Sequence, residues 1–206
     1  MLAVLFAIVL GASSAGVPVP AELAGKSVPK TVMKNLVVLD VPYRDFSGER
    51  RTGRVVCHAA AAADLRGLFD TLYASGYAFT SVRPVSEFGF SDSLSMLADN
   101  TSAFNWRKVK GTTRMSAHAL GLAIDVAPLR NPFEHRRGTR PAGARHDLRV
   151  PGTLSDTSLV VRYLRARGWW WGGRWASGRD WQHFELPMDM ALAKGRGRHR
   201  VAERKP

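Results

Sequence analysis

The stretch Ser116-Ala-His118-Ala-Leu-Gly121-Leu-Ala-Ile-Asp125 and the later stretch Asp180-Trp-Gln-His183-Phe-Glu185 together carry two histidines and three acidic residues. Small residues lie between His118 and Asp125, and aromatic residues flank His183. Two imidazoles and one carboxylate are a nitrogen and oxygen ligand set that suits Zn²⁺. Three protein ligands leave the fourth tetrahedral position open, as in catalytic rather than structural zinc sites.

Each half of this pattern has an ordinary explanation when it is taken alone. A His followed by an Asp arises by chance in many proteins, and a lone buried His is usually hydrogen-bonded core. The two halves together favour metal binding. We therefore predict that His118, Asp125 and His183 bind one metal ion, and that Asp180 accepts a proton from water. The alternative for Asp180 is a cap at the edge of a strand.

The same residues resemble those of a known group of enzymes. The pattern Ser-x-His-x-x-Gly-x-Ala-x-Asp with a later acidic-x-x-His is similar to the zinc peptidases of the D-alanyl-D-alanine carboxypeptidase type, in the wider lysostaphin, D-Ala-D-Ala peptidase and hedgehog fold group. The L-alanyl-D-glutamate endopeptidase branch is the most similar, because it ends in Asp-x-x-His-Phe-Glu after a tryptophan and glycine segment, here residues 168–173. Residues 99–107 and 131–133 also look like that branch. The resemblance covers about residues 50–190.

This resemblance implies a zinc peptidase that hydrolyses peptide bonds in peptidoglycan stem peptides. It assigns His118, Asp125 and His183 as zinc ligands and Asp180 as the catalytic base. It also places Arg83 beside the substrate, where a cation would stabilise an oxyanion. Arg83 is followed by Pro-Val-Ser-Glu instead of the more usual Arg-Ser segment, and a solvated surface cation is the alternative.

Ser116 and Trp181 are candidates for contact with substrate. Ser116 precedes a predicted ligand by two positions and could orient that ligand or bind the substrate backbone. On a strand, alternate residues share a face, so we expect Trp181 to point the same way as His183. Glu185 could support a ligand imidazole or form an unrelated salt bridge. The tryptophans at 169–171 could line a groove, although a cluster of this kind is more often core.

Two classes of function remain open at this point. The first is the peptidase, as a carboxypeptidase or an endopeptidase. The second is a non-catalytic wall-binding module that keeps the fold and the metal. Asp180 favours the enzyme, because a binding module has no need of a base. Serine nucleophile catalysis is not indicated, since the Gly-x-Ser-x-Gly elbow is missing from the sequence.

Composition restricts the class of partner. The chain has 206 residues, of which 45% are hydrophobic and 23% charged, and a net charge of +13. These values predict one globular domain that is attracted to anionic surfaces. Anionic wall polymers fit this charge, whereas the zinc-finger and other nucleic-acid patterns are not found in the sequence. The single cysteine, Cys57, cannot form an internal disulfide and is expected to be packed in the core.

Four segments are expected along the chain. Residues 1–15 form an apolar run that ends in small residues and predict a signal peptide for export, although no Lys or Arg precedes the run. A buried N-terminal helix is the alternative, because the run is too short for a stable membrane span. Residues 16–49 predict an N-terminal arm, 50–190 the peptidase domain and 191–206 a basic tail without regular structure. We expect a monomer.

The hydrophobic periodicity predicts a small α+β domain with a central antiparallel sheet flanked by helices. Long arginine- and glycine-rich loops, such as 128–151, are of the kind that form lids or groove walls. The expected strands are residues 37–43, 54–58, 77–82, 122–127 and 181–186; the expected helices are 59–74, 91–97 and 157–167; and residues 100–110 form a wall rich in loops.

Overall fold

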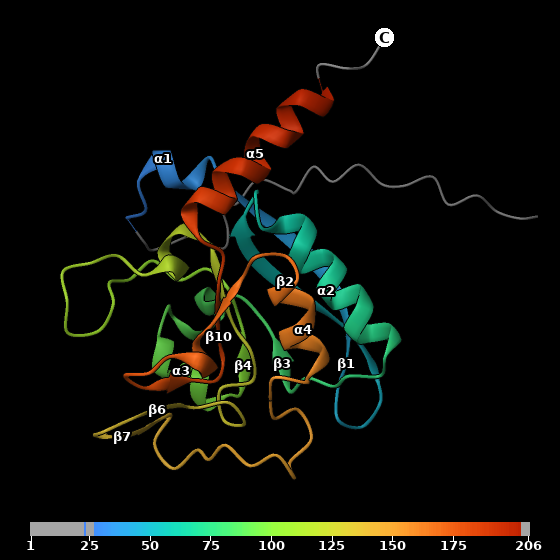
Figure 1. Cartoon of the computed structure of the whole chain (residues 1–206), viewed down its shortest axis with the longest axis vertical. Helices are drawn as coiled ribbons and strands as arrows, with labels where there is room; N and C mark the ends of the chain where they lie inside the picture. The colour runs from blue at the N-terminus through green and yellow to red at the C-terminus, as the bar shows by residue number, and fades with distance from the viewer. Residues whose placement is uncertain (1–22, 24–26, 203–206) are drawn as a thin grey trace, which may run out of the picture.

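The computed structural model describes residues 23 and 27–202, without the side chains of 196–202. The expected signal peptide, residues 1–15, lies outside the described residues. Within them, the fold is α+β, as predicted, with helices packed around several small sheets (Figure 1).

The largest apolar cluster lies between a long hairpin and two helices. Strand β1 (Leu36–Arg44) pairs antiparallel with β2 (Arg50–His58) along its full length. Helix α2 (Ala62–Ala74) packs against β1, and α4 (Leu159–Arg165) lies beside α2 (Figure 1). The apolar residues of α2 that recur at helical spacing, Leu65, Leu68, Phe69 and Leu72, are all buried.

The folded domain begins earlier in the chain than we expected. Leu39 and Val41 of β1 belong to the main core, although both fall in the segment that we expected to be an arm. Their burial follows from the pairing with β2, which turns alternate residues of β1 towards α2. The folded domain therefore includes β1, and Cys57 on β2 is fully buried as expected.

A second, three-stranded sheet positions two of the three predicted ligands, Asp125 and His183. Strand β10 (His183–Glu185) lies between β5 (Ala123–Asp125) and β8 (Trp170–Trp171), and both pairings are antiparallel. In the first pairing, His183 lies directly opposite Asp125. Directly opposed residues of neighbouring strands have their Cβ atoms about 4.5–5.5 Å apart, so the register alone brings this pair together.

The expected single central sheet is divided. Two two-stranded and two three-stranded sheets occur among the described residues, and one pairing is parallel. One cause is the turn at Trp181 and Gln182, which separates β9 (Arg179–Asp180) from β10 so that each joins a different sheet. The remaining elements are α1 (Lys30–Met33), β3 (Ser81–Val82), η2 (Val85–Phe88), α3 (Asp92–Leu97), β4 (Asn100–Thr101), η3 (Ala117–Leu120), β6 (Phe133–His135), β7 (Gly138–Arg140), η4 (Gly172–Arg174), β9 (Arg179–Asp180) and α5 (Met188–Ala202).

Two segments that we expected to be irregular contain regular structure. Within residues 128–151, β6 and β7 form a short antiparallel hairpin to which β9 adds a third strand. Helix α5 continues to Ala202, into the segment that we expected to be a tail without regular structure, and projects from the body of the molecule (Figure 1).

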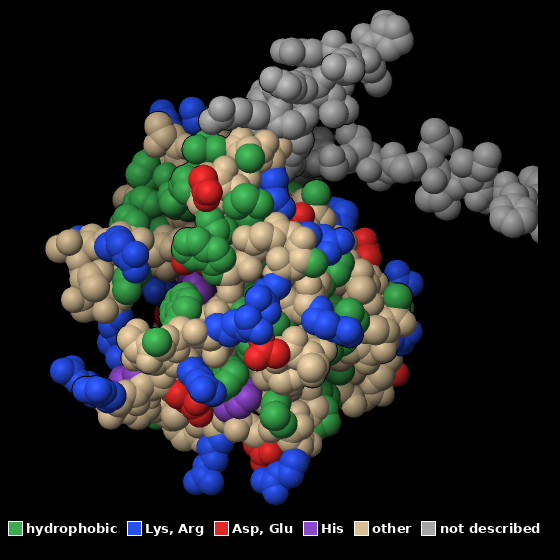
Figure 2. Space-filling view, in the orientation of Figure 1, with side chains coloured by type: hydrophobic (Ala, Val, Ile, Leu, Met, Phe, Trp, Pro, Cys, Tyr) green, Lys and Arg blue, Asp and Glu red, His purple; other side chains and the backbone are tan. Residues whose placement is uncertain are grey.

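Positive charge is distributed over the surface. Lys and Arg side chains are spread across the face shown in Figure 2 rather than collected at one place. Among the described residues, no helix has the length and apolar character that a membrane span requires.

Candidate metal centre

A tight turn places His118. Helix η3 begins after Ser116, whose Oγ accepts a hydrogen bond of 3.3 Å from the backbone N–H of His118. The turn ends at Gly121, which has a φ of +68°. A Cβ on Gly121 would lie 2.5 Å from the backbone nitrogen of His58 on β2, so only glycine fits here. The spacing between His118 and Asp125 thus accommodates one turn and a short strand.

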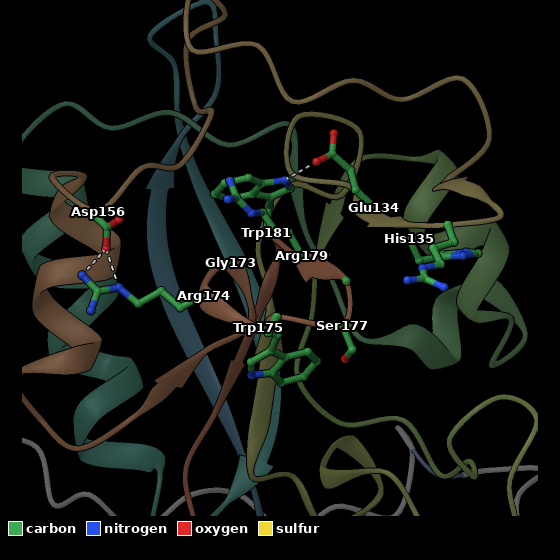
Figure 3. Close-up of a pocket in the computed structure, with 12 residues that line it drawn as sticks. Glu134, His135, Asp156, Gly173, Arg174, Trp175, Ser177, Arg179 and Trp181 are labelled. Carbon is green, nitrogen blue, oxygen red and sulfur yellow. Dashed lines mark hydrogen bonds and ion pairs between the residues drawn. The ribbon is translucent and has the colours of Figure 1, made fainter.

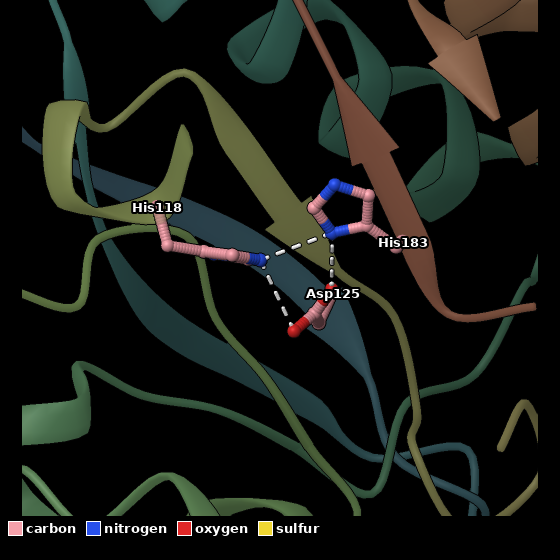
Figure 4. Close-up of side chains that lie close together, drawn as sticks. All are labelled: His118, Asp125 and His183. Carbon is pink, nitrogen blue, oxygen red and sulfur yellow. Dashed lines mark hydrogen bonds and ion pairs between the residues drawn. The ribbon is translucent and has the colours of Figure 1, made fainter. Parts of the chain in front are cut away.

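The three predicted ligands converge (Figure 4). The Nε2 atom of His118 lies 3.1 Å from Nδ1 of His183 and 3.2 Å from Oδ2 of Asp125. The Nδ1 atom of His183 lies 3.0 Å from Oδ1 of Asp125. Both histidines are buried. The structure therefore brings together the full ligand set that the sequence predicted.

Each imidazole has a partner for its other ring nitrogen. Nδ1 of His118 lies 2.5 Å from the carbonyl oxygen of Ala103, and Nε2 of His183 lies 3.4 Å from Oε2 of Glu185. Carbonyl and carboxylate partners of this kind fix the orientation of metal-binding histidines. Of the two roles left open for Glu185, the structure favours support of a ligand imidazole.

Asp125 and His183 each shift the pKa of the other. Burial alone would raise the pKa of Asp125, but His118 and His183 hold that pKa well below its usual range. Burial would lower the pKa of His183, whereas Asp125 and Glu185 more than reverse this and raise it. The cluster therefore holds an ionised carboxylate against the two imidazoles, which is the form in which a carboxylate binds a metal ion.

The geometry fits a tetrahedral ion. Nitrogen and oxygen ligands lie about 2.0–2.2 Å from Zn²⁺, so neighbouring ligand atoms are roughly 3.4 Å apart in a tetrahedral site. The three separations here, 3.1, 3.2 and 3.0 Å, are close to that value. These residues could hold Zn²⁺ with little rearrangement and leave one position for a water or a substrate oxygen.

Asp180 lies in the same cavity as the three ligands. It is the last residue of β9, and its Oδ1 atom is buried without a hydrogen-bond partner. Burial raises the pKa of this carboxyl group to about 6, although nearby His183 opposes the shift. A carboxylate with a pKa close to neutrality and an uncommitted oxygen is suited to accept a proton.

The cavity has a volume of about 760 Å³ and includes four cationic side chains, Arg107, Lys110, Arg114 and Arg140. Part of one wall comes from the β6–β7 hairpin, through Phe133, Thr139 and Arg140. Of the two roles left open for the 128–151 segment, a lid or a groove wall, the structure favours the groove wall. Gln182 also lines the cavity, and its Oε1 atom is buried without a partner.

The two other candidates for substrate contact, Ser116 and Trp181, line different cavities. Ser116 lines the metal cavity, where its hydroxyl caps the turn that carries His118. Trp181 lines a neighbouring cavity of about 870 Å³ instead (Figure 3). Its ring stacks on His146 and its Nε1 donates to Glu134. The alternation that we expected between Trp181 and His183 does not occur, because Trp181 lies in the turn before β10.

Arg83 is not among the residues that line the metal cavity. Its Nε donates to Oε2 of Glu87 at 2.7 Å, and its guanidinium lies over the ring of Phe88. Because Arg83 lies outside this lining, its role beside a substrate stays a prediction from the resemblance. The cations that the structure places at the cavity instead include Arg107, which is the last residue of the 99–107 block that carries part of the resemblance.

Trp175 is a further residue that the sequence did not single out. Its ring lies 5.4 Å from that of His183, and it lines both cavities. It follows the glycine pair at 172–173 that ends the tryptophan-rich segment, which is the only signal that could have drawn attention to it.

Comparison with known proteins supports the same chemistry. No curated protein and no solved structure matches the chain. One family model does match, and the matched residues include the three predicted ligands and Asp180. The resemblance drawn from the motifs is thereby confirmed: residues 110–186 match the family described as D-alanyl-D-alanine carboxypeptidase.

Proposed function

We propose that this protein is a zinc peptidase that cleaves peptide bonds in peptidoglycan stem peptides. The observation that carries the proposal is the convergence of His118, Asp125 and His183 in a cavity that also holds the buried carboxylate of Asp180. The family match supports a peptidase of the D-alanyl-D-alanine carboxypeptidase type.

The residues divide the chemistry as follows. A bound zinc ion would supply Lewis acidity at the substrate carbonyl and at water. Asp180 accepts a proton from the attacking water and returns it to the leaving amine. Burial raises the pKa of this carboxyl group, and a more basic carboxylate accepts a proton from water more readily. Glu185 and the Ala103 carbonyl hold the two imidazoles in their binding orientation.

The proposed substrate lies outside the cytoplasmic membrane. The net charge of +13 favours approach to anionic wall polymers. The apolar run at 1–15 supports export to the periplasm or the cell wall. The Asp-x-x-His-Phe-Glu ending and the tryptophan-rich segment favour the bond between L-Ala and D-Glu, and a carboxypeptidase acting on D-Ala-D-Ala is the related alternative.

Digestion of purified peptidoglycan tests the proposal. The zinc-loaded protein is incubated with walls of several types, and the fragments are identified by mass spectrometry. L-Ala ends left on the glycan side would show endopeptidase action, and released D-Ala would show carboxypeptidase action. The Asp180→Asn variant is the matched control for contaminating hydrolases. No cleavage by the zinc-loaded protein on any wall would contradict the proposal and favour the non-catalytic wall-binding module.

A further inference from the structure

Arg107 is fixed relative to the candidate ligands by backbone hydrogen bonds. Its carbonyl oxygen accepts from the backbone N–H of Ser116 at 3.1 Å, and the N–H of Asn105 donates to the carbonyl oxygen of His118 at 3.1 Å. Residues 105–107 are thereby attached on both sides to the turn that carries His118. The position of the Arg107 side chain is consequently coupled to that of the metal cluster.

A second set of bonds orients the guanidinium group. Its Nε donates to Oδ1 of Asp92 on α3 at 3.0 Å, and Nδ2 of Asn105 donates to the same oxygen at 3.2 Å. Arg107 and Asp92 are both partly exposed, at 29% and 36% of their side-chain surface, and both line the cavity. A guanidinium held through Nε still has its two terminal amino groups, and these can bind a carboxylate with two parallel hydrogen bonds.

Arg107 and the proposed base Asp180 line the same cavity. Arg107 is near enough to Asp180 to lower the pKa of that carboxyl group, in opposition to the larger effect of burial. If Asp180 returns a proton to the leaving amine, the residue that contains this amine must lie next to Asp180. The nearest anionic group on such a residue is an α-carboxylate, which is attached to the carbon that bears the leaving nitrogen.

The other cations of the cavity are less suited to this task. Lys110 and Arg114 are exposed. An exposed, mobile cation contributes less binding free energy than one that is already oriented. Among the cationic residues that line the cavity, Arg107 is the one with a side-chain ion pair to another lining residue.

We propose that Arg107, oriented by Asp92, binds a free α-carboxylate on the leaving side of the scissile bond. The cavity then selects peptides whose leaving residue has an unmodified carboxylate. The inference rests on the proposed function and specifies its substrate class. It covers both candidate bonds, because the leaving residue can have a free α-carboxylate in a D-Ala-D-Ala peptide and in an L-Ala-D-Glu peptide.

Calorimetric binding to zinc-loaded Asp180→Asn protein tests this directly, because the ligand is not consumed. The probes are two pairs of short peptides, one ending in D-Ala-D-Ala and one containing L-Ala-D-Glu. In each pair, the α-carboxylate of the leaving residue is either free or amidated. We expect at least one free acid to bind about 10- to 150-fold more tightly than its amide, as for a charge-assisted hydrogen bond that is lost.

Variants in the same background assign that preference to Arg107. Adding Arg107→Ala should remove the preference for the acid and leave the affinity for the amide unchanged within a few-fold. Arg107→Lys and Asp92→Asn should each retain part of it, because the charge remains without its fixed orientation. Arg149→Ala, an exposed cation paired with Asp147 outside the cavity, should leave the preference intact. Zinc content and circular dichroism confirm that each variant is folded.

The outcomes separate this inference from the proposed function. An acid preference that survives Arg107→Ala, equal binding of acid and amide, or no binding of either pair would each overturn the role of Arg107. Peptidoglycan cleavage by the wild-type protein would still support the peptidase in all three cases. Conversely, Arg107-dependent binding without any cleavage of peptidoglycan would support the subsite and contradict the catalytic proposal.

Discussion

His118, Asp125 and His183 differ from Asp180 in what their side chains can do at the site. The first three point their ligand atoms at one another, within 4.8 Å. Asp180 shares the cavity, but its Oδ1 atom is buried without a partner. This difference predicts two classes of variant, one that loses the metal ion and one that keeps it but cannot transfer the proton.

We expect Asp180→Asn to retain about one zinc ion per chain and to lose hydrolysis by a factor on the order of 10² to 10⁴, as for removal of a general base. His118→Ala and His183→Ala should lose the zinc as well. Elemental analysis and wall digestion on the same preparations measure both effects. Loss of zinc from Asp180→Asn would show that Asp180 is a ligand, and full zinc content in both histidine variants would contradict the assignment of the site.

Asp180 should also make the stability of the metal-free protein depend on pH. Its folded-state pKa, about 6, lies above its ordinary value of 3.8. Between these values the folded protein holds a proton that the unfolded chain releases, so this group destabilises the fold increasingly as the pH rises from about 4 to 6. Above pH 6, Asp180→Asn should be more stable than the wild type by about 1 to 3 kcal/mol.

Urea unfolding of the zinc-free proteins measures this difference. Near pH 4 the two proteins should have similar stability, because Asp180 is then protonated in the folded state. A difference that is the same at pH 4 and pH 7 would mean that the substitution acts through packing and not through the charge. A gain in stability on removal of a catalytic base is expected, because catalytic groups are often held in positions that destabilise the fold.

At the scale of the elements, η3 depends on its contact with β2. Gly121 ends the turn in the left-handed region, and its carbonyl oxygen accepts a hydrogen bond of 2.8 Å from the N–H of His58. A side chain here would collide with the β2 backbone and move the turn away from it. Because η3 carries His118, such a displacement changes the metal site as well as the packing.

We expect Gly121→Ala to destabilise the protein by roughly 2 kcal/mol or more, through backbone strain and the collision together, and to weaken zinc binding. Gly111→Ala is the matched control. Gly111 also has a positive φ, of 78°, but a Cβ there would meet nothing within 4 Å. The control should therefore lose only about 1 kcal/mol and keep its zinc affinity. Equal losses in the two variants would show that the contact with β2 is unimportant.

The elements that the sequence predicted well are those set by local pattern. The apolar spacing of α2 is a local signal, and both α2 and α3 lie where they were expected. The sequence predicted the set of His118, Asp125 and His183 because residues of metal-binding type stand close together in two short stretches, 116–125 and 180–185. The motif can therefore be recognised in the sequence without knowledge of the rest of the fold.

The features that the sequence did not predict depend on distant contacts. The turn at Trp181 and Gln182 contains neither glycine nor proline, so nothing in it indicated that β9 and β10 belong to different sheets. Arg107 is oriented by Asp92, which lies on another element. β1 enters the core through its pairing with β2 and its packing against α2. Each of these outcomes is decided by tertiary packing, which hydrophobic periodicity does not report.

At the scale of the whole molecule, the candidate ligands connect parts of the chain that are far apart in sequence. His118 lies on η3, Asp125 on β5 and His183 on β10, and the last two strands also join the sheet that contains β8. An ion bound by all three would bind the folded protein and not the unfolded chain. Binding of that kind raises the free energy of unfolding by mass action.

Zinc should therefore raise the thermal stability of the protein in a concentration-dependent way. Free zinc at about 1,000 times its Kd adds about 4 kcal/mol, and each kcal/mol raises the Tm of a domain of this size by about 2–4 °C. We expect the chelated protein to melt roughly 8–16 °C below the zinc-loaded protein, as measured by scanning calorimetry. His183→Ala should melt at the same temperature with and without zinc, because one of its three ligands is gone. A wild-type Tm that did not respond to zinc would contradict the metal centre. It would mean that His118, Asp125 and His183 are held together by their mutual hydrogen bonds alone.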